Sequence, residues 1–525
     1  MNRDRYVDFL RAWAIGLVVL GHWLITALVR EPGGEIRAPE LLATVPWTQW
    51  LTLGFQIMPL FFLAGGHAAG GSWARARAAG GTAAGWVGAR ALRLLLPAAV
   101  YSGLVLSAVG ICSAVGVDPN TLELVGWAMA MQFWFLPVYL LLSALTPPLH
   151  AAHRRWGLLV PVAMGAVALV ADTLVVTVHT PYVGLLDYVL VWGVAYQLGF
   201  CWRDGLLTER RPLPAALAAG GALAFATLIT LGPFPVSLIL VTGQTPSNTD
   251  PPSAAMLAWA LAQVGLCLLA APAVRRLLDR ERVWRAVRPV GGASMTLYLW
   301  HMLPVLIVAA AFYLTGLAPE PTLGSAAWWG LRLPWLLVLG VVLTGVVRAL
   351  RPLERGLSLL YERTRPDPGF SRSSRSSGSS GSWLPWLPWL GLAASVTALT
   401  RFATRGFAPD GRFPVLPALG LLLGTTLLTA RRRTTVDRGT PGSPRRLCGK
   451  PPDVTSASVG GTGGRQISGL SPCRPWLRGR LIRSGQSRPR SSLWCASRRK
   501  TPRSSDGTAV PGSSRNSPTG RGRRD

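Results

Sequence analysis

The pattern of apolar and polar residues divides most of the chain into long apolar segments separated by short polar loops. A helix needs about 20 apolar residues to cross the hydrocarbon core of a bilayer. Ten segments approach or exceed this length, although the fourth is short and contains proline. They comprise residues 6–29, 47–69, 94–115, 132–148, 157–178, 183–203, 212–231, 253–274, 290–315 and 327–350. We therefore expect an all-α polytopic membrane protein with about ten transmembrane helices.

Positively charged residues lie almost entirely in alternate loops. The loops after the second, fourth, sixth and eighth segments contain Arg75, Arg77, Arg90, Arg93, Arg154, Arg155, Arg203, Arg210, Arg211, Arg275, Arg276, Arg280, Arg282, Arg285 and Arg288. The loops on the opposite side contain only Arg30 and Arg37. Because Lys and Arg are concentrated in cytoplasmic loops, this asymmetry predicts a multi-pass protein of the cell membrane with a cytoplasmic N-terminus.

The character of the sequence changes after the tenth segment. We expect a membrane domain over residues 1–365 and a flexible Ser/Gly-rich linker over 366–382. Two short, Pro-rich apolar stretches within 383–430 could form a further helical hairpin. Residues 431–525 are rich in Arg, Ser, Gly and Pro without periodicity, which predicts a disordered basic tail. Removal of everything after Arg365 is expected to leave activity intact.

Two interpretations of this tail remain open, a basic arm that binds anionic lipid or out-of-frame translation of GC-rich sequence. The lack of any pattern favours the second. The tail also explains much of the net charge of +30, because it holds 22 basic against 4 acidic residues. The charge therefore does not indicate a nucleic-acid partner. The six cysteines show no CxxC spacing, so neither a disulfide framework nor a metal site is expected.

The first apolar segment contains three polar side chains that are costly in a membrane. Arg11 and His22 are eleven residues apart, which is about three turns and roughly 16.5 Å along one face of a helix. Asp8 lies three residues before Arg11 and so near the same face. Charged groups cost about 2.5–3.5 kcal/mol in a membrane span and usually mark functional sites. Alternatively, His22 makes a polar interhelical contact and Arg11 extends its charge to the membrane interface.

Five stretches, taken in order, resemble motifs of the membrane acyltransferase 3 family, which comprises O-acetyltransferase-like integral membrane acyltransferases. They are DFLRAWAIGLVVLGHW with Arg11 and His22, MPLFFLAGGHAAGGSW at 58–73, GARALRLLLP at 88–97, FWFLPVYLLL at 133–142 and VGGASMTLYLWHMLP at 290–304. The resemblance covers about residues 4–350. Two features depart from it: His67 replaces a larger aromatic or aliphatic residue, and the Glu of some family branches is absent after Trp134.

The resemblance implies a function and two catalytic residues. The protein would move an acyl group, most commonly acetyl, from cytoplasmic acyl-CoA to a hydroxyl of an envelope glycan, a glycolipid or a secreted small molecule. The neutral imidazole of His22 would remove the hydroxyl proton as a general base, with a transient acyl-histidine as an open alternative. Arg11 would hold the polar part of the donor, and Asp8 would orient Arg11. No metal is expected.

Further residues are assigned through the same resemblance. Arg90 and Arg93, three residues apart and hence expected on one helical face, are candidates for the CoA phosphates, followed by Arg75 and Arg77, because guanidinium groups bind phosphate bidentately. These arginines could instead serve only membrane topology. The residues expected to line the site are Asp8, His301, Tyr298, Trp134, Ser72 and His67. Asp172 and Asp187 could bind acceptor hydroxyls at the outer ends of their segments, or could simply be solvated.

Two other classes of function remain to be separated from an acyltransferase. A proton-coupled membrane transporter is the main alternative, since intramembrane His, Arg and Asp also form ion pathways. A carrier commonly has paired halves with broken helices at corresponding positions, and the sequence contains no visible internal repeat. A membrane-bound interaction protein with a basic tail would leave the motifs without a role.

Overall fold

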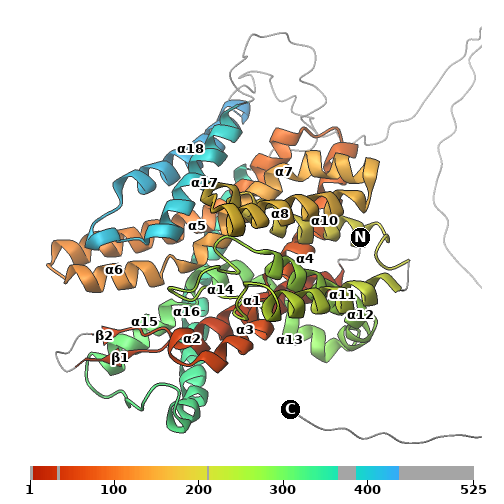
Figure 1. The fold of residues 1–525 in the computed structure, drawn as a ribbon. Helices are drawn as coiled ribbons and strands as arrows, with labels where there is room; N and C mark the ends of the chain where they lie inside the picture. The colour runs from red at the N-terminus through yellow and green to blue at the C-terminus, as the bar shows by residue number, and fades with distance from the viewer. Residues whose placement is uncertain (1–3, 32–35, 210–211, 365–385, 437–525) are drawn as a thin grey trace, which may run out of the picture. The chain divides into compact units, whose positions relative to one another are not determined.

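The computed structural model describes residues 4–31, 36–209, 212–364 and 386–436, all of which belong to one unit, Met1–Pro444. The predicted linker at 366–382 and the tail from residue 437 onward lie outside the described residues. The α-helices (Figure 1) are α1 (Arg5–Ile25), α2 (Leu41–Thr44), α3 (Thr52–Phe55), α4 (Met58–Ala78), α5 (Ala83–Ala114), α6 (Pro119–Ala128), α7 (Phe135–Trp156), α8 (Leu159–Val178), α9 (Pro181–Gly184), α10 (Asp187–Arg203), α11 (Pro212–Thr230), α12 (Ala254–Leu278), α13 (Glu281–Gly292), α14 (Ser294–Trp300), α15 (Leu303–Val308), α16 (Ala326–Thr364), α17 (Leu387–Arg405) and α18 (Val415–Val436).

Shorter elements complete the described structure. Two strands, β1 (Val29–Arg30) and β2 (Ile36–Arg37), form an antiparallel pair after α1. The remaining helical turns are η1 (Pro46–Leu51), η2 (Met131–Trp134), the π-helical η3 (Ala309–Tyr313) and η5 (Pro409–Gly411).

The helix lengths confirm the expected fold class. Nine helical segments among the described residues are long and apolar enough to cross a membrane, or ten if the bent pair formed by α14 and α15–η3 counts as one span. The cytoplasmic position of the N-terminus stays a prediction from the loop charges. The hairpin considered for residues 383–430 corresponds to α17 and α18, and α18 extends to Val436, into residues assigned from the sequence to the disordered tail.

Glycines allow two central helices to cross closely. A Cβ atom on Gly199 of α10 would lie 2.6 Å from the amide nitrogen of His67 in α4, and one on Gly66 of α4 would collide with the carbonyl oxygen of Tyr196. In a membrane, such small residues let backbones approach and gain van der Waals contact. Helices α4 and α10 thus form a tight pair at the centre of the bundle, against which α1, α7 and α8 pack.

The start of α1 is fixed by Asp4. Its side chain accepts a hydrogen bond from the amide of Tyr6 at 2.9 Å and so caps the helix. The same carboxylate pairs with Arg275 at the end of α12, with an Nη2–Oδ2 distance of 2.8 Å. Partial burial would raise the pKa of Asp4, but the hydrogen bonds and charge of Arg275, with backbone amide donors, outweigh it and lower this pKa. The cap and ion pair together anchor the helix that carries Arg11 and His22.

A break between α14 and α15 shapes the site. The segment Ser294–Trp300 is bent by 41° from Leu303–Tyr313. Pro304 explains the break, because it has no amide hydrogen and its ring clashes with the carbonyl group four residues earlier, that of Trp300. His301 therefore lies at the end of α14, where its carbonyl oxygen is available to a neighbouring helix.

Candidate active site

Two histidines from distant parts of the chain meet between α1 and α14. The Nδ1 atom of His22 lies 2.8 Å from the Nε2 atom of His301, within hydrogen-bond distance. His22 is partly buried, whereas His301 is completely buried. The pair joins the residue predicted as the base to one predicted only to line the site.

Backbone carbonyls determine which nitrogen of His301 carries the proton. Its Nδ1 atom lies 3.0 Å from the carbonyl oxygen of Tyr298 and 3.2 Å from that of Leu297. A carbonyl oxygen can only accept, so Nδ1 of neutral His301 must donate and Nε2 must be the acceptor. His22 then donates from Nδ1 to His301, which leaves an unprotonated Nε2 on His22. The arrangement holds His22 in the tautomer that a general base requires.

A tryptophan next to His22 secures the backbone of His301. The indole Nε1 of Trp23 donates to the carbonyl oxygen of His301 at 2.7 Å. This carbonyl is available because α14 ends at Trp300. The break in the helix therefore places both the side chain and the backbone of His301 against α1.

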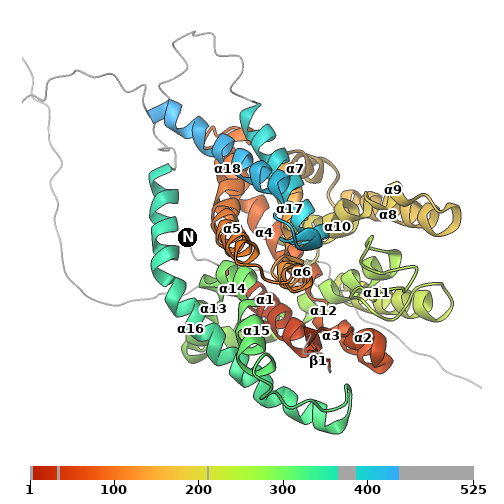
Figure 2. The ribbon, with the colours of Figure 1, turned by 90° about the vertical axis from the view of Figure 1, so that its left-hand side faces the viewer.

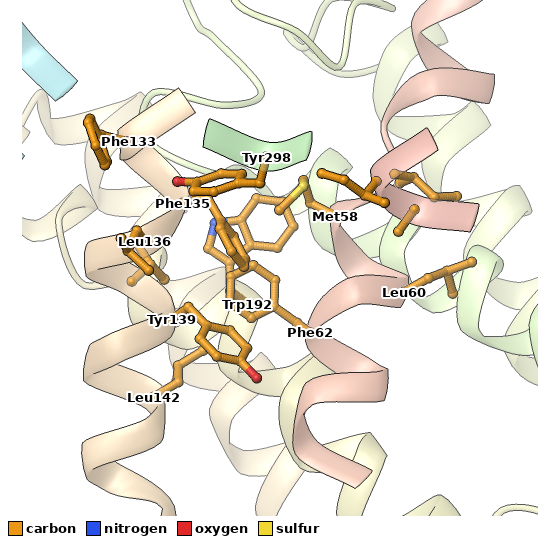
Figure 3. Close-up of a cluster of buried hydrophobic side chains, with 14 of the residues drawn as sticks. Met58, Leu60, Phe62, Phe133, Phe135, Leu136, Tyr139, Leu142, Trp192 and Tyr298 are labelled. Atoms are coloured by element: carbon orange, nitrogen blue, oxygen red, sulfur yellow. The ribbon is translucent and has the colours of Figure 1, made fainter. Parts of the chain in front are cut away.

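Aromatic side chains pack around Tyr298, which lies three residues before His301 in the chain (Figure 3). Tyr298 donates its hydroxyl to the carbonyl oxygen of Gln132 at 2.7 Å, and its ring centroid lies 5.8 Å from that of Phe135. Trp134 contacts Trp192 with ring centroids 5.9 Å apart. Tyr298 is thus part of the framework that supports His301, and Trp134 contributes to the neighbouring aromatic packing.

Arg11 retains its hydrogen-bonding capacity. It is partly buried on α1, and among the residues that the structure describes it makes no hydrogen bond or ion pair. Asp8, one turn earlier, is also partly buried and has an interaction partner, and its role in orienting Arg11 stays a prediction. The guanidinium of Arg11 can accept an anionic ligand without breaking an existing ion pair.

The two arginines of α5 have different environments. Arg90 lies against α7, where its Nη2 donates to the Tyr139 hydroxyl at 2.8 Å and its Nε to the Ser143 hydroxyl at 3.4 Å. Arg93 is exposed. Residues three apart differ by about 60° around a helix, and α7 covers Arg90 while Arg93 is left exposed.

Four other residues predicted from the sequence have environments of their own, separate from the histidine pair. Arg75 and Arg77 are exposed at the end of α4. His67 packs on Trp202 with ring centroids 4.6 Å apart, and Ser72 accepts a hydrogen bond from Trp86 Nε1 at 3.1 Å. His67 and Ser72 thus connect α4 to α10 and α5, while Arg75 and Arg77 are accessible at the surface.

The two aspartates considered for the acceptor are buried. Asp172 accepts a hydrogen bond from the amide of Ala254 at 2.9 Å and so supports the first turn of α12. Asp187 is fully buried, and within the described residues its carboxylate oxygens have no hydrogen-bond partner. Neither is a solvated helix-end carboxylate.

Gln132 is a structural component of the site that sequence reasoning missed. Its Nε2 donates to the Tyr101 hydroxyl at 3.0 Å and to the carbonyl oxygen of Leu299 at 3.2 Å. It is 2 % exposed. In the sequence, Gln132 stands out only as a polar residue directly before the FWF stretch. Its partners Tyr101 and Leu299 are distant in the chain, so its role could not be predicted.

The geometry can be compared with known proteins. No curated protein and no solved structure matches the chain. The family model described as an acyltransferase domain matches residues 4–350, which include both histidines, the arginines of α4 and α5, and the break before α15. The chain belongs to the acyltransferase 3 family of membrane proteins.

Proposed function

We propose that the protein transfers an acetyl group from cytoplasmic acetyl-CoA to a hydroxyl group of an envelope glycan, a glycolipid or a secreted small molecule. The observation that carries this proposal is the hydrogen bond of 2.8 Å between His22 and His301. The carbonyl acceptors of His301 orient the pair so that Nε2 of His22 has a free lone pair. A neutral imidazole in this state is a suitable base for a hydroxyl group.

The transfer proceeds in two steps, and the proton that His22 accepts in the first step is returned in the second. The acceptor hydroxyl gives its proton to Nε2 of His22 while its oxygen forms a bond to the thioester carbonyl carbon. The tetrahedral intermediate then breaks its C–S bond, and the imidazolium returns the proton to the departing thiolate. Nε2 of His301 stabilises the positive charge because it accepts the Nδ1–H of His22 throughout. The products are an ester and free CoA.

Two arginines support the assignment of CoA as the donor. Arg11 has a guanidinium without an ion-pair partner among the described residues, about three turns from His22 along α1. Arg90 presents a second guanidinium at the α5–α7 contact. Because the loop charges predict a cytoplasmic N-terminus, both residues would lie on the side from which acyl-CoA arrives.

A carrier function is less well supported. Carriers commonly contain broken helices at corresponding positions of two repeats. In the described ranges one helix pair is broken by more than 40°, at His301, and this break has a local role because it presents the His301 carbonyl to Trp23.

The proposed function is tested with the purified full-length protein in lipid nanodiscs and [1-¹⁴C]acetyl-CoA. Glycerol, methyl glucoside and a detergent-solubilised envelope glycolipid fraction serve as hydroxyl acceptors. We expect release of CoA thiol and recovery of the label as an alkali-labile ester with at least one acceptor. Absence of both CoA release and labelled ester with every acceptor would refute the proposal for acetyl-CoA and these classes of acceptor.

The environments of Arg90 and Arg93 predict different effects on donor binding. We expect Arg90→Gln to raise the KM for acetyl-CoA about tenfold, equivalent to the ~1.4 kcal/mol of one charge-assisted hydrogen bond. Arg93→Gln is the matched control and should change this KM less than twofold, because Arg93 is exposed. If the KM for acetyl-CoA of Arg90→Gln equals that of wild type, or if this variant loses only kcat, Arg90 has a structural role at Tyr139.

A further inference from the structure

The hairpin formed by α17 and α18 lies beyond the family match, which ends at residue 350. Its two helices cross closely, since a Cβ atom on Gly424 would lie 2.6 Å from the carbonyl oxygen of Gly391. Figure 2 shows the hairpin beside α5 and α7. The hairpin is therefore a packed part of the membrane unit, although the sequence suggested that the chain after Arg365 was dispensable.

The tip of the hairpin is joined to α6 through its backbone. Gly406 adopts φ +74°, which ends α17, and the amide of Phe407 donates to the carbonyl oxygen of Gly126 at 3.1 Å. A Cβ atom on Gly126 would lie 2.7 Å from the amide nitrogen of Ala408. The position of the tip is therefore set by direct contact between two backbones.

Phe407 inserts its ring into the aromatic cluster of the family domain. It is completely buried, and its ring centroid lies 5.7 Å from that of Phe133 and 6.1 Å from that of Tyr101. Phe402 is also fully buried, and its ring centroid lies 4.6 Å from that of Phe407. The hairpin thus supplies two rings that hold Phe133 and Tyr101 in place.

A chain of hydrogen bonds continues from Tyr101 toward the histidine pair. The Tyr101 hydroxyl accepts from Gln132 Nε2 at 3.0 Å, and the same Nε2 donates to the carbonyl oxygen of Leu299 at 3.2 Å. The backbone carbonyl of Gln132 accepts from Tyr298 at 2.7 Å. The Tyr298 carbonyl in turn accepts from Nδ1 of His301 at 3.0 Å.

We propose that the α17–α18 hairpin completes the active site, with Phe407 as a positioning residue that acts on His301 through Tyr101, Gln132 and Tyr298. This inference rests on the proposed function. Loss of the Phe407 ring leaves space into which Tyr101 and Phe133 relax. The carbonyls that orient His301 then move, and His22 is held less firmly in the tautomer with a free Nε2.

The test compares Phe407→Ala with Phe413→Ala in the full chain in nanodiscs. Phe413 belongs to the same hairpin and is 42 % exposed, so it is a matched control. We expect Phe407→Ala to lower kcat about tenfold or more, as for small misplacements of catalytic groups, with the KM for acetyl-CoA nearly unchanged. Phe407→Leu should recover most of the activity, and removal of residues after Arg365 should lower kcat at least as much as Phe407→Ala.

A second readout does not depend on acyl transfer. In ¹⁵N-histidine NMR spectra, wild type and Phe413→Ala should show one tautomer for His22 and one for His301, whereas Phe407→Ala should show mixed tautomers. Unchanged kcat and unchanged tautomers in Phe407→Ala would overturn the inference. If Phe407→Ala does not fold, Phe402→Ala, which removes the buried ring packed on Phe407, decides instead. Mixed tautomers in that variant support the inference, and single tautomers with unchanged kcat overturn it. If wild type transfers no acetyl group, the proposed function fails and the spectra alone decide this inference.

Discussion

Replacement of His22 by glutamine is expected to lower kcat for acetyl transfer by about 100- to 10 000-fold, the usual contribution of a general base. Glutamine can still donate a side-chain N–H to Nε2 of His301, so the contact between α1 and α14 is retained. It cannot accept a proton near neutral pH. Initial rates of CoA release and ester formation, measured at saturating acetyl-CoA, give the change in kcat.

The control for this variant is His179→Asn. His179 is exposed and adopts φ 55° at the end of α8, a conformation that asparagine tolerates. This control should retain wild-type kcat. A His22→Gln protein that inserts normally and turns over within threefold of wild type would exclude His22 as the base.

Replacement of His301 by leucine is expected to have the second largest effect. Leucine offers no acceptor for the Nδ1–H of His22, so the tautomer with a free Nε2 is no longer favoured and the imidazolium loses its stabilising partner. We expect kcat to fall about 100-fold, within the range of a perturbed acid–base catalyst, while the KM for acetyl-CoA changes little. Steady-state kinetics at several acetyl-CoA concentrations separate the two parameters.

His301→Gln is the companion to this variant. A glutamine amide can accept from His22 through its oxygen and donate to the Tyr298 carbonyl through its nitrogen, so it should restore part of the lost kcat. If His301→Leu and His301→Gln have wild-type kcat, or if both only raise the KM, His301 does not orient His22. The transfer would then depend on a different partner of the imidazole.

Much of the fold could be predicted from the sequence because membrane helices have a strong local signal. About 20 apolar residues define a span wherever they occur, and the register of Arg11 and His22 follows from helical geometry alone. The motif around Tyr298 also pointed to His301 as a residue near the site. These predictions depend only on local sequence or on a known family pattern.

The pairing within the site could not be predicted in the same way. His22 and His301 are separated by 279 positions, and their contact depends on the break at Pro304 and on how α14 packs against α1. The contrast between Arg90 and Arg93 also depends on packing, because the α7 surface decides which face of α5 is buried. Apolar periodicity alone gives no such information.

The C-terminal hairpin gives a second reason why part of the structure could not be predicted from the sequence. Its helices are short and rich in proline, and they follow a Ser/Gly-rich segment, so the sequence separated them from the membrane domain. Their role depends on Phe407, whose partners Tyr101 and Phe133 lie roughly 300 residues earlier in the chain. Contacts of this kind are visible only in three dimensions.

The central claim is that His22 activates a hydroxyl group for attack on acyl-CoA. Its most direct test uses sealed proteoliposomes that contain purified wild type or His22→Gln, with [1-¹⁴C]acetyl-CoA outside and the acceptor that is active in nanodiscs inside. Protease accessibility of an affinity tag at the N-terminus selects preparations of matched orientation. We predict CoA release in equal amount to labelled ester for wild type, and initial rates of both that are at least about 100-fold lower for His22→Gln. Equal ester formation by both proteins, or passage of labelled acetyl-CoA across the membrane without CoA release, would contradict the account.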